Sequence, residues 1–381
     1  MTEYKDLPIS EELRQAVAEM GFTHLTEIQE KAIPVMLEGR EIIAKAPTGT
    51  GKTCAFGIPI IEKLDPASKE LQALILCPTR ELCTQICEDL RDLAKFKPGL
   101  QVVSVYGGQP MGKQLAALGR KPQVVVATPG RLLDHMGRRT IRLNKVSTVV
   151  LDEADEMLNM GFFKDVRKIL DALPKQKQMV MFSATISREV MDIGWLYQRD
   201  AEEITIQPVE LSRPKITQYS YEVTGRKKIA VMAGLIKKQG YGRVLIFCNT
   251  KYATTSLCEQ LAAYGLETEC LNGDMIQSAR NKIMARYKAG EIGILIATDV
   301  AARGIDVEDI DVVFNFDVPQ DNESYTHRIG RTGRAQREGV AYIFYSPDER
   351  QRLKNIIRYT RNDIRPIIAD EEGNITLEQP N

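Results

Sequence analysis

The stretch from Ala46 to Thr53, with the sequence Ala-Pro-Thr-Gly-Thr-Gly-Lys-Thr, constrains the fold of this chain more than any other. An apolar run over residues 41–44 precedes it and indicates a strand, and the residues from Thr53 onward are typical of the start of a helix. In this context the pattern is a phosphate-binding loop. Gly49 and Gly51 allow a tight turn whose N–H groups point at an anion, and the helix N-terminus adds partial positive charge. The alternative is a glycine-rich turn that binds nothing.

The lysine and threonine that end this loop predict a nucleoside triphosphate as the ligand. Lys52 is placed to reach the β- and γ-phosphates, and the Thr53 hydroxyl is placed to bind Mg²⁺. Ala46 stands where the general pattern has its first glycine. The predicted nucleotide-binding residues of the loop are Thr48, Gly49, Thr50, Gly51, Lys52 and Thr53.

Length and composition are those of an ordinary globular protein with more than one domain. The chain has 381 residues and a formal net charge of zero, and its length suffices for two or three domains with their own cores. No apolar run reaches the roughly 18 residues of a membrane-spanning helix, and the first residues lack the apolar segment of a signal peptide. With zero net charge, any nucleic-acid surface is expected to be a local groove.

The cysteine pattern indicates a reducing compartment. The seven cysteines include no Cys-x-x-Cys pair, which argues against a disulfide-linked secreted fold. Cys83 and Cys87 share a predicted helical face, but two thiols are too few for a structural zinc site. We therefore expect a cytoplasmic protein without a membrane partner, with a monomer as the default state.

Apolar runs rich in valine, isoleucine and leucine alternate with helical patterns, which is typical of parallel sheets covered by helices on both faces. Residues 207–215 interrupt this alternation with two prolines and no periodicity, and they indicate a short flexible linker. We predict an α/β fold of two doubly wound parallel-sheet domains, residues 1–206 and 216–368. Residues 348–361 predict an amphipathic, arginine-rich helix, and residues 369–381 are expected to be a disordered tail.

The two halves look like divergent copies of one architecture. Leu-Ile-Leu-Cys-Pro-Thr-Arg at residues 74–80 matches Leu-Ile-Phe-Cys-Asn-Thr-Lys at residues 245–251. An Ala-Thr pair follows the cysteine of this stretch at nearly the same distance in both halves, at residues 127–128 and 297–298. Because the second half has no Gly-Lys-Thr, we expect its function to depend on a cleft between the two domains.

A short acidic motif follows the apolar run at residues 148–151. It reads Asp152-Glu153-Ala154-Asp155. Asp152 can hold Mg²⁺ directly or through water, and Glu153 can orient an attacking water and accept its proton. Asp155 can tie this loop to a group across the cleft. The alternative for Asp155 alone is an acidic helix N-terminus that is favoured by the helix dipole.

Two more stretches complete a set of motifs. Gly21-Phe22 with Thr26-Glu-Ile-Gln29 lies near the start, and Ser324-Tyr-Thr-His327-Arg-Ile-Gly-Arg331-Thr-Gly-Arg334 lies near the end. Together with the glycine loop and Asp-Glu-Ala-Asp, in this order, they resemble the DEAD-box RNA helicases of superfamily 2, over about residues 4–345. The likeness is to a bacterial helicase core. It implies two RecA-like domains, ATP and Mg²⁺ as cofactors, and RNA as the partner.

The resemblance also implies which residues read the nucleoside. Gln29 carries an amide that both donates and accepts, which suits adenine, and Phe22 can stack on the base. The alternative for Phe22 is a core aromatic. Asp306, which follows Arg303-Gly-Ile, is implied to contact the ribose, with a turn-forming aspartate as the alternative.

In the second half, His327 and Arg331 lie one turn apart if this stretch is helical. The resemblance implies that Arg331 and Arg334 are arginine fingers for the γ-phosphate and that His327 bridges to the acidic motif. Arg328 is not on that face, and the alternative that it belongs to a basic helix surface facing RNA or solvent is left open. The resemblance further implies that Asp155, Ser183 and Thr185 couple the two domains.

Loops at strand ends in both halves supply the predicted RNA track. They offer hydroxyls, glycine N–H groups and arginines, which suit phosphates and riboses rather than base edges, and they lack aromatic stacking platforms. We therefore expect RNA binding through the backbone without sequence preference, with 2′-hydroxyl contacts favouring RNA over DNA. The residues are Pro78, Thr79, Arg80, Gly108, Thr128, Arg131, Gly273, Asp274, Arg280 and Thr298.

The expected function is RNA-dependent ATP hydrolysis that locally opens short RNA duplexes or remodels RNA–protein complexes. A binding-module alternative is an ATP-locked RNA clamp or scaffold with little turnover, because the same residues serve both. A DNA helicase is a third possibility. Steady-state ATP turnover with and without RNA separates the enzyme from the clamp.

Overall fold

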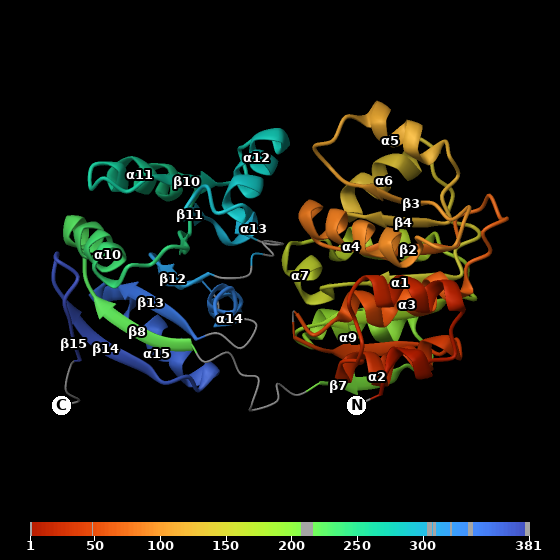
Figure 1. Ribbon diagram of the computed structural model, residues 1–381, viewed down its shortest axis with the longest axis horizontal. Helices are drawn as coiled ribbons and strands as arrows, with labels where there is room; N and C mark the ends of the chain where they lie inside the picture. Colours follow the sequence, from red (N-terminus) through yellow and green to blue (C-terminus); the bar gives the residue numbers. More distant parts are fainter. Residues whose placement is uncertain are drawn as a thin grey trace. The chain divides into compact units, whose positions relative to one another are not determined.

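The chain divides into two units, Met1–Pro208 and Val209–Asn381 (Figure 1). Its computed structural model describes residues 2–47, 49–206, 216–302, 307, 310–320, 322–333 and 338–377. The division between the units falls inside the stretch expected to be a linker, and residues 207–215 lie outside the described residues. No helix in the described part of the chain is long and apolar enough to cross a membrane.

In the described part of the first unit, a seven-stranded sheet has the order β3-β4-β2-β5-β6-β1-β7, and every neighbouring pair is parallel. Its central strands are buried on both faces, as their continuous apolar sequences predict. The strands are β1 (Ile42–Lys45), β2 (Ala73–Leu76), β3 (Val102–Val105), β4 (Val124–Ala127), β5 (Thr148–Leu151), β6 (Gln178–Ser183) and β7 (Glu202–Thr205).

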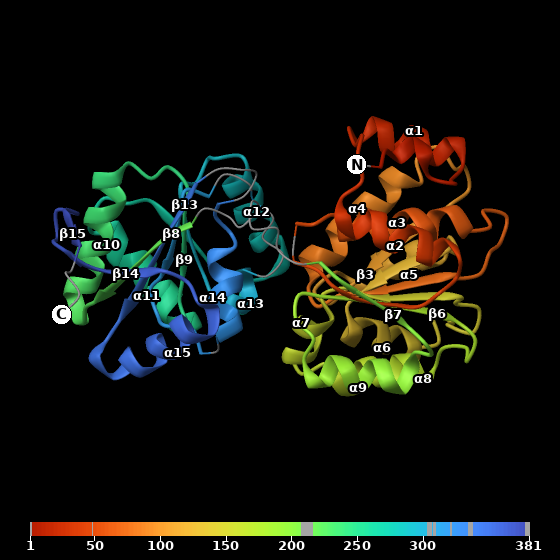
Figure 2. The ribbon, with the colours of Figure 1, turned by 90° about the horizontal axis from the view of Figure 1, so that it is seen from below.

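Helices cover both faces of this sheet. One buried cluster joins strand residues to α1, α2, α3 and α4, and a second joins the opposite face to α6, α7, α8 and α9. Figure 2 shows these two helical layers on either side of the strands. The helices are α1 (Glu11–Glu19), α2 (Glu27–Leu37), α3 (Lys52–Lys63), α4 (Arg80–Leu93), α5 (Met111–Leu118), α6 (Pro129–Gly137), α7 (Ala154–Asn159), α8 (Phe163–Asp171) and α9 (Arg188–Tyr197).

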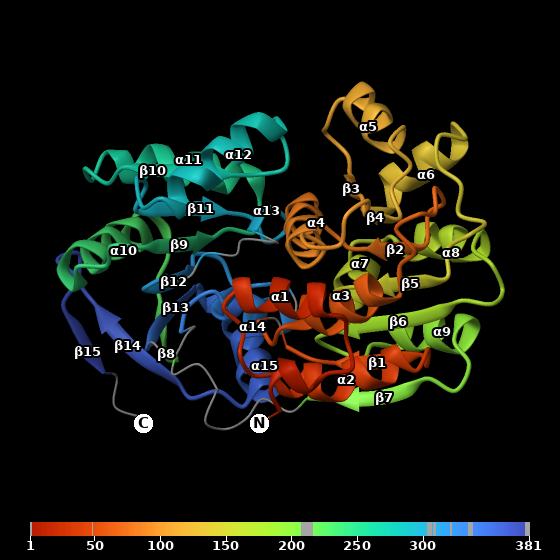
Figure 3. The ribbon, with the colours of Figure 1, turned by 45° about the vertical axis from the view of Figure 1, so that its right-hand side comes forward.

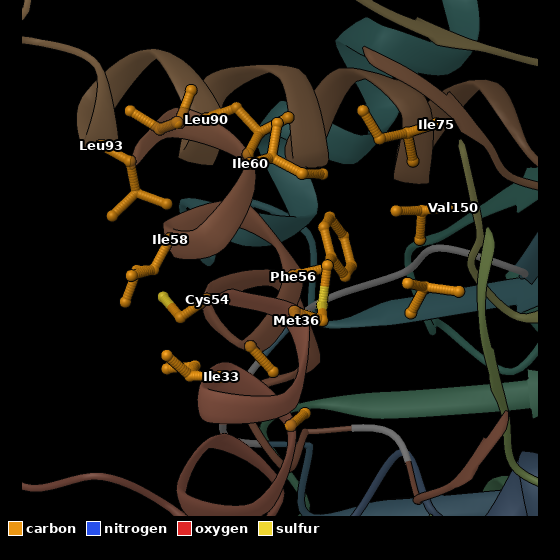
Figure 4. Packing of buried hydrophobic residues seen from close by; sticks show 14 of the residues in the cluster. Ile33, Met36, Cys54, Phe56, Ile58, Ile60, Ile75, Leu90, Leu93 and Val150 are labelled. Atoms are coloured by element: carbon orange, nitrogen blue, oxygen red, sulfur yellow. The ribbon is translucent and has the colours of Figure 1, made fainter. Parts of the chain in front are cut away.

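The helix that follows the phosphate loop is the centre of one of these cores. Residues of α3 pack against Met36 of α2, Leu90 of α4 and the strand residues Ile75 and Val150 (Figure 4). The ring centroid of Phe56 lies 5.6 Å from that of Phe182 on β6. Because α3 is buried along most of its length, its N-terminus is held rigidly at the carboxyl edge of the sheet.

The described part of the second unit repeats this topology. Its eight-stranded sheet has the order β10-β11-β9-β12-β13-β8-β14-β15, in which the first six positions match β3-β4-β2-β5-β6-β1 in chain order. This match confirms two doubly wound domains of one kind. The strands are β8 (Ile216–Glu222), β9 (Val244–Phe247), β10 (Thr268–Leu271), β11 (Ile294–Ala297), β12 (Val312–Asn315), β13 (Gly339–Tyr345), β14 (Ile364–Ala369) and β15 (Ile375–Leu377).

Helices also cover both faces of the second sheet. One buried cluster contains residues of α10 and α11, and two others contain residues of α12 and α13 and of α14 and α15. The predicted amphipathic helix is α15, which buries Leu353 and Ile356. The helices are α10 (Gly225–Gln239), α11 (Lys251–Ala262), α12 (Gln277–Lys288), α13 (Asp299–Ala302), α14 (Asn322–Ile329) and α15 (Arg350–Thr360).

The expected disorder of residues 369–381 is wrong for the part that the structure describes. β15 pairs antiparallel with β14, and the turn between them packs on α10 (Figure 3). A Cβ built on Gly373 would lie 2.3 Å from the carbonyl oxygen of Gly234. This close backbone approach, together with the buried side chains of Ile367 and Ala369, orders the segment up to residue 377.

The same contact gives a stability prediction. Replacing a helix-interior glycine by alanine ordinarily stabilises a helix by about 1 kcal/mol. A Cβ on Gly234, however, would lie 2.3 Å from the carbonyl oxygen of Glu371. We therefore expect Gly234→Ala to destabilise the second unit by about 1–3 kcal/mol.

Urea unfolding followed by circular dichroism measures this change. The control is Gly112→Ala in α5, where an added Cβ meets nothing within 4 Å. A Gly234 variant as stable as the parent would show that the β14–β15 turn does not pack on α10.

Candidate nucleotide and nucleic-acid site

The phosphate loop joins β1 to α3, as its sequence predicts. The N–H of Ala46 donates to the carbonyl oxygen of Ser183 at 2.9 Å, which fixes the start of the loop on β6. Gly51 has φ +88° and occupies the N-cap of α3, a left-handed conformation that suits glycine. Lys52 is buried, and its Nζ donates to the carbonyl oxygen of Ala46 at 3.3 Å. Thr48 lies outside the described residues.

Gln29 braces the phosphate loop from α2. Its Nε2 donates to the carbonyl oxygen of Gly51 at 3.0 Å, and its Oε1 accepts from the Tyr4 hydroxyl at 2.5 Å and from the Thr26 N–H at 2.9 Å. The Thr26 hydroxyl in turn donates to the carbonyl oxygen of Thr50 at 2.7 Å. A Cβ on Gly51 would lie 2.4 Å from Gln29 Nε2, so this bond requires glycine there.

Phe22 lies on the surface. Its side chain is 43% exposed, which rules out the core aromatic that the sequence left open. Its ring centroid lies 6.3 Å from that of Tyr4, so one face of the ring is backed by a buried tyrosine. This leaves an exposed aromatic surface on the same segment as Gln29, as stacking on a base requires.

The acidic element follows β5 directly. Asp152 is 2% exposed, and burial raises the pKa of its carboxyl above the ordinary value, against the opposing charge of Lys52. Glu153 has φ +49° at the N-cap of α7, a left-handed conformation that a glutamate adopts only when its surroundings hold it there. Such backbone strain is typical of functional positions.

Asp155 binds the turn after β6 within the first unit. Its Oδ2 accepts from both the N–H and the hydroxyl of Thr185 at 2.8 Å, and its own N–H donates to Ser183 Oγ at 3.1 Å. Ser183 Oγ donates to the carbonyl oxygen of Thr185 at 2.7 Å. The buried carboxylate is therefore satisfied inside this unit, and it locks the acidic loop to the Ser-Ala-Thr turn.

Thr53 and Asp152 offer a hydroxyl and a buried carboxylate, which are two hard oxygen donors. Mg²⁺ takes hard oxygen ligands and usually combines one or two carboxylates with waters and substrate phosphates. Across the described residues, no group of three or more histidine, cysteine, aspartate or glutamate side chains could hold a metal ion. The Thr53 hydroxyl and the Asp152 carboxylate are oxygen donors of the kind that Mg²⁺ takes.

The predicted RNA residues of the first unit lie at helix N-termini after strands. Thr79 is the N-cap of α4, where its Oγ1 accepts from the Leu82 N–H at 3.2 Å, and Thr128 is the N-cap of α6. Pro78 precedes the first of these caps. The Arg80 guanidinium lies against the backbone of Gly108, and Arg131 donates to the carbonyl oxygen of Gln109 at 3.0 Å. Helix N-termini with adjacent arginines favour anions such as phosphate.

The second unit places its predicted RNA residues in the same manner. Thr298 precedes α13, and its Oγ1 accepts from the Ala301 N–H at 3.4 Å. Arg280 of α12 donates to the carbonyl oxygen of Ala301 at 3.2 Å. Gly273 is exposed, and the exposed Asp274 forms an ion pair with Lys251. These groups gather at the carboxyl edge of β10 and β11.

The arginine-rich motif runs along α14 and just beyond it. His327 is half-buried, and the Nε of Arg331 donates to its carbonyl oxygen at 3.3 Å, so these two residues lie one turn apart as predicted. Arg328 is 1% exposed, so the open reading of a surface arginine facing RNA or solvent is wrong. Arg334 and Asp306 lie outside the described residues.

Comparisons with known proteins agree with this geometry. The family model described as "DEAD/DEAH box helicase" matches residues 26–193, and the model described as "Helicase conserved C-terminal domain" matches residues 227–336. The DEAD-box ATP-dependent RNA helicase CshA of Bacillus cereus is 43% identical over 361 residues, which cover 95% of this chain and 69% of that protein. The chain belongs to the DEAD-box helicase family. CshA of Bacillus subtilis is 44% identical over 358 residues, covering 94% of this chain and 72% of that protein.

Solved structures of DEAD-box proteins share the fold. Dbp5 of Saccharomyces cerevisiae bound to RNA and ADP BeF3 has a TM-score of 0.86 at 32% identity, with 96% of this chain and 95% of that chain covered. A DEAD box protein from Methanococcus jannaschii has a TM-score of 0.55 at 39% identity, with 97% and 99% covered. The chain therefore has the tandem RecA-like domains of DEAD-box helicases.

Sequence reasoning missed two features of this DEAD-box site. Tyr4 stands at the upstream aromatic position of the motif that contains Gln29, but its hydrogen bond to Gln29, which spans 25 positions in the sequence, was not predicted. Thr250 caps α11 with a bond from the Ala253 N–H at 3.1 Å, in the same position as Thr79 on α4. The match between residues 74–80 and 245–251 contains this threonine and could have identified it.

Proposed function

We propose that this chain is an ATP-dependent RNA helicase that hydrolyses ATP when RNA is bound and locally opens short RNA duplexes or remodels RNA–protein complexes. The observation that carries the proposal is the hydrogen-bond network that joins the phosphate loop to the acidic loop: the Ala46 N–H bonds to the Ser183 carbonyl oxygen, and Ser183 and Thr185 bond to Asp155. The proposal is supported by the order of the strands, since β1, β5 and β6, which precede these loops, are neighbours in one parallel sheet. The names of its relatives support the same activity.

ATP is bound by the first unit in this proposal. The loop N–H groups and Lys52 hold the phosphates, and Phe22 stacks on the base. The Gln29 Nε2 group has two hydrogens, one of which is bonded to Gly51; the other donates to adenine. Asp306 of the second unit contacts the ribose. Mg²⁺, held by Thr53 and Asp152, neutralises phosphate charge when it is bound.

Hydrolysis requires groups from both units. Glu153 orients the attacking water and accepts its proton. Arg331 and Arg334 stabilise the charge that develops on the γ-phosphate, and His327 bridges to the acidic loop and the Ser183–Thr185 turn. ATP and RNA each bind both units, so each raises the affinity for the other. We also propose that the protein acts as a monomer in the cytoplasm.

RNA lies along the helix N-termini of both units. Phosphates and riboses contact the ten residues predicted from the sequence: Pro78, Thr79, Arg80, Gly108, Thr128, Arg131, Gly273, Asp274, Arg280 and Thr298. Because none of these ten residues is aromatic and most offer hydroxyl, backbone or guanidinium groups, affinity does not depend on base sequence.

Steady-state ATP turnover with and without RNA tests this function. We expect single-stranded RNAs of unrelated sequence to stimulate turnover equally, DNA of the same sequence to stimulate it much less, and a short RNA duplex to be separated in the presence of ATP. Tight ATP-dependent RNA binding without stimulated turnover or strand release would instead identify an ATP-locked clamp. Equal stimulation by DNA would contradict the 2′-hydroxyl contacts.

A further inference from the structure

Arg328 is the largest fully buried side chain among the described residues. Its guanidinium has five N–H groups, and each has an acceptor. Nε and Nη2 donate to the two carboxylate oxygens of Asp299, both at 2.6 Å. Nη2 also donates to Asn249 Oδ1 at 2.8 Å, and Nη1 donates to the carbonyl oxygen of Asp317 at 2.8 Å and to Asn315 Oδ1 at 3.4 Å.

These acceptors come from the ends of three neighbouring strands. The register aligns Phe247 of β9 with Ala297 of β11 and with Asn315 of β12. Asn249, Asp299 and Asp317 each stand two residues beyond one of these aligned positions. One guanidinium from α14 therefore holds three loops at the carboxyl edge of the second sheet. Figure 2 shows α13, which begins at Asp299, beside α14.

Further bonds tie these loops to one another. The Asn249 N–H donates to Asp317 Oδ2 at 2.9 Å, and Asn249 Nδ2 donates to the carbonyl oxygen of Val318 at 2.9 Å. Lys228 Nζ lies 3.7 Å from Asp317 Oδ1. The cluster thus balances two cations against two carboxylates, and it forms a connected network rather than a single ion pair.

The geometry of the Arg328–Asp299 ion pair fixes the orientation of the two side chains more than it stabilises the fold. A buried ion pair gains little net stability because desolvation offsets its attraction. A planar guanidinium that grips both oxygens of one carboxylate, however, fixes direction as well as distance. The Phe247 ring, whose centroid is 5.2 Å from the guanidinium carbon, adds a flat surface on which the group lies.

We propose that Arg328 is a positioning residue through which RNA bound at the Thr298 loop sets the orientation of α14, and with it His327 and Arg331. Asp299 is bonded to Arg328 and directly follows Thr298, a predicted RNA contact. His327 directly precedes Arg328 on α14, and Arg331 bonds to His327 within one turn. A shift of the Thr298 loop on RNA binding therefore reaches these two groups through Arg328. This inference rests on the proposed function.

The test is Arg328→Lys in the full chain. A lysine keeps the charge but donates from one nitrogen, so it cannot span Asp299, Asn249 and Asp317 together. We expect kcat for ATP at saturating RNA to fall about tenfold to a hundredfold, while the RNA-independent rate and the affinity for a fluorescent ATP analogue stay unchanged. The matched control is Arg286→Lys, which alters only partly exposed ion pairs with Glu269 and Glu291.

Unchanged RNA-stimulated kcat in a folded Arg328→Lys variant would overturn the inference. If that variant does not fold, Asp299→Asn takes its place and is expected to lower kcat by the same factor, with an unaltered kcat again overturning it. Where both variants fold, the double variant should have a kcat no lower than that of the slower single variant, because both substitutions remove the same Arg328–Asp299 contact. A parent protein without RNA-stimulated turnover would instead contradict the proposed function, so the two failures are distinct.

Discussion

We expect Glu153→Gln to lower the rate of ATP hydrolysis by about 10²- to 10⁴-fold while ATP and RNA stay bound together. Glutamine keeps the size of the side chain and the left-handed backbone at this position, but its amide cannot accept a proton from water. Asp152 and Lys52, to which we assign Mg²⁺ and the phosphates in the proposed function, are not altered. Single-turnover hydrolysis and retention of labelled RNA on a filter in the presence of ATP measure the two effects.

The matched control for this variant is Glu189→Gln. Glu189 is an exposed glutamate in the first turn of α9, in the same unit, so its loss changes the charge equally without touching the site. Rapid hydrolysis by the Glu153 variant would remove Glu153 from its role as base. A variant that no longer binds ATP would show that Glu153 holds the nucleotide instead.

The second large effect is expected for Arg331→Ala. Arg331 lies just beyond α14 in the second unit, whereas the phosphate loop is in the first. Loss of this guanidinium should therefore leave ATP affinity near normal and reduce RNA-stimulated turnover at least about a hundredfold. Arg334→Ala is expected to have an effect of the same kind. Steady-state kinetics at saturating RNA measures both.

Arg286→Ala is the control for the arginine variants, since it removes a half-exposed arginine of the same unit that pairs with Glu269. If turnover of the Arg331 variant equals that of this control, Arg331 does not act on the γ-phosphate. A loss of ATP affinity that matches the loss of turnover would show instead that Arg331 binds the ground state.

The sequence predicts two doubly wound parallel-sheet domains because buried parallel strands and repeated spacing leave a strong pattern. It missed β14 and β15 for local reasons. Pro366 interrupts the run 364–369 and is typical of a strand break, yet it precedes the residues of β14 that pair with β15. β15 has only three residues, two of them exposed, so its place depends on packing against α10 rather than on a pattern of its own.

Contiguous motifs allow candidate site residues to be named from the sequence, because their chemistry depends on neighbours in the sequence. Arg328 is different, since its acceptors at Asn249, Asp299 and Asp317 lie 79, 29 and 11 positions away. Helical periodicity alone left open whether Arg328 lies on the surface. A sequence signal for this buried site does exist: a polar residue stands two positions beyond each of three predicted neighbouring strands. Such residues meet at the carboxyl edge of one sheet.

The first unit has its own sheet and its own buried clusters, so residues 1–208 can be tested alone. The central claim is that ATP is bound by this unit and hydrolysed only with groups from the second. ATP turnover by the isolated unit, measured with and without RNA beside the full chain, tests it most directly. We predict that the isolated unit binds ATP and that RNA does not accelerate its slow turnover. Turnover by the isolated unit with RNA as fast as that of the full chain would contradict this account.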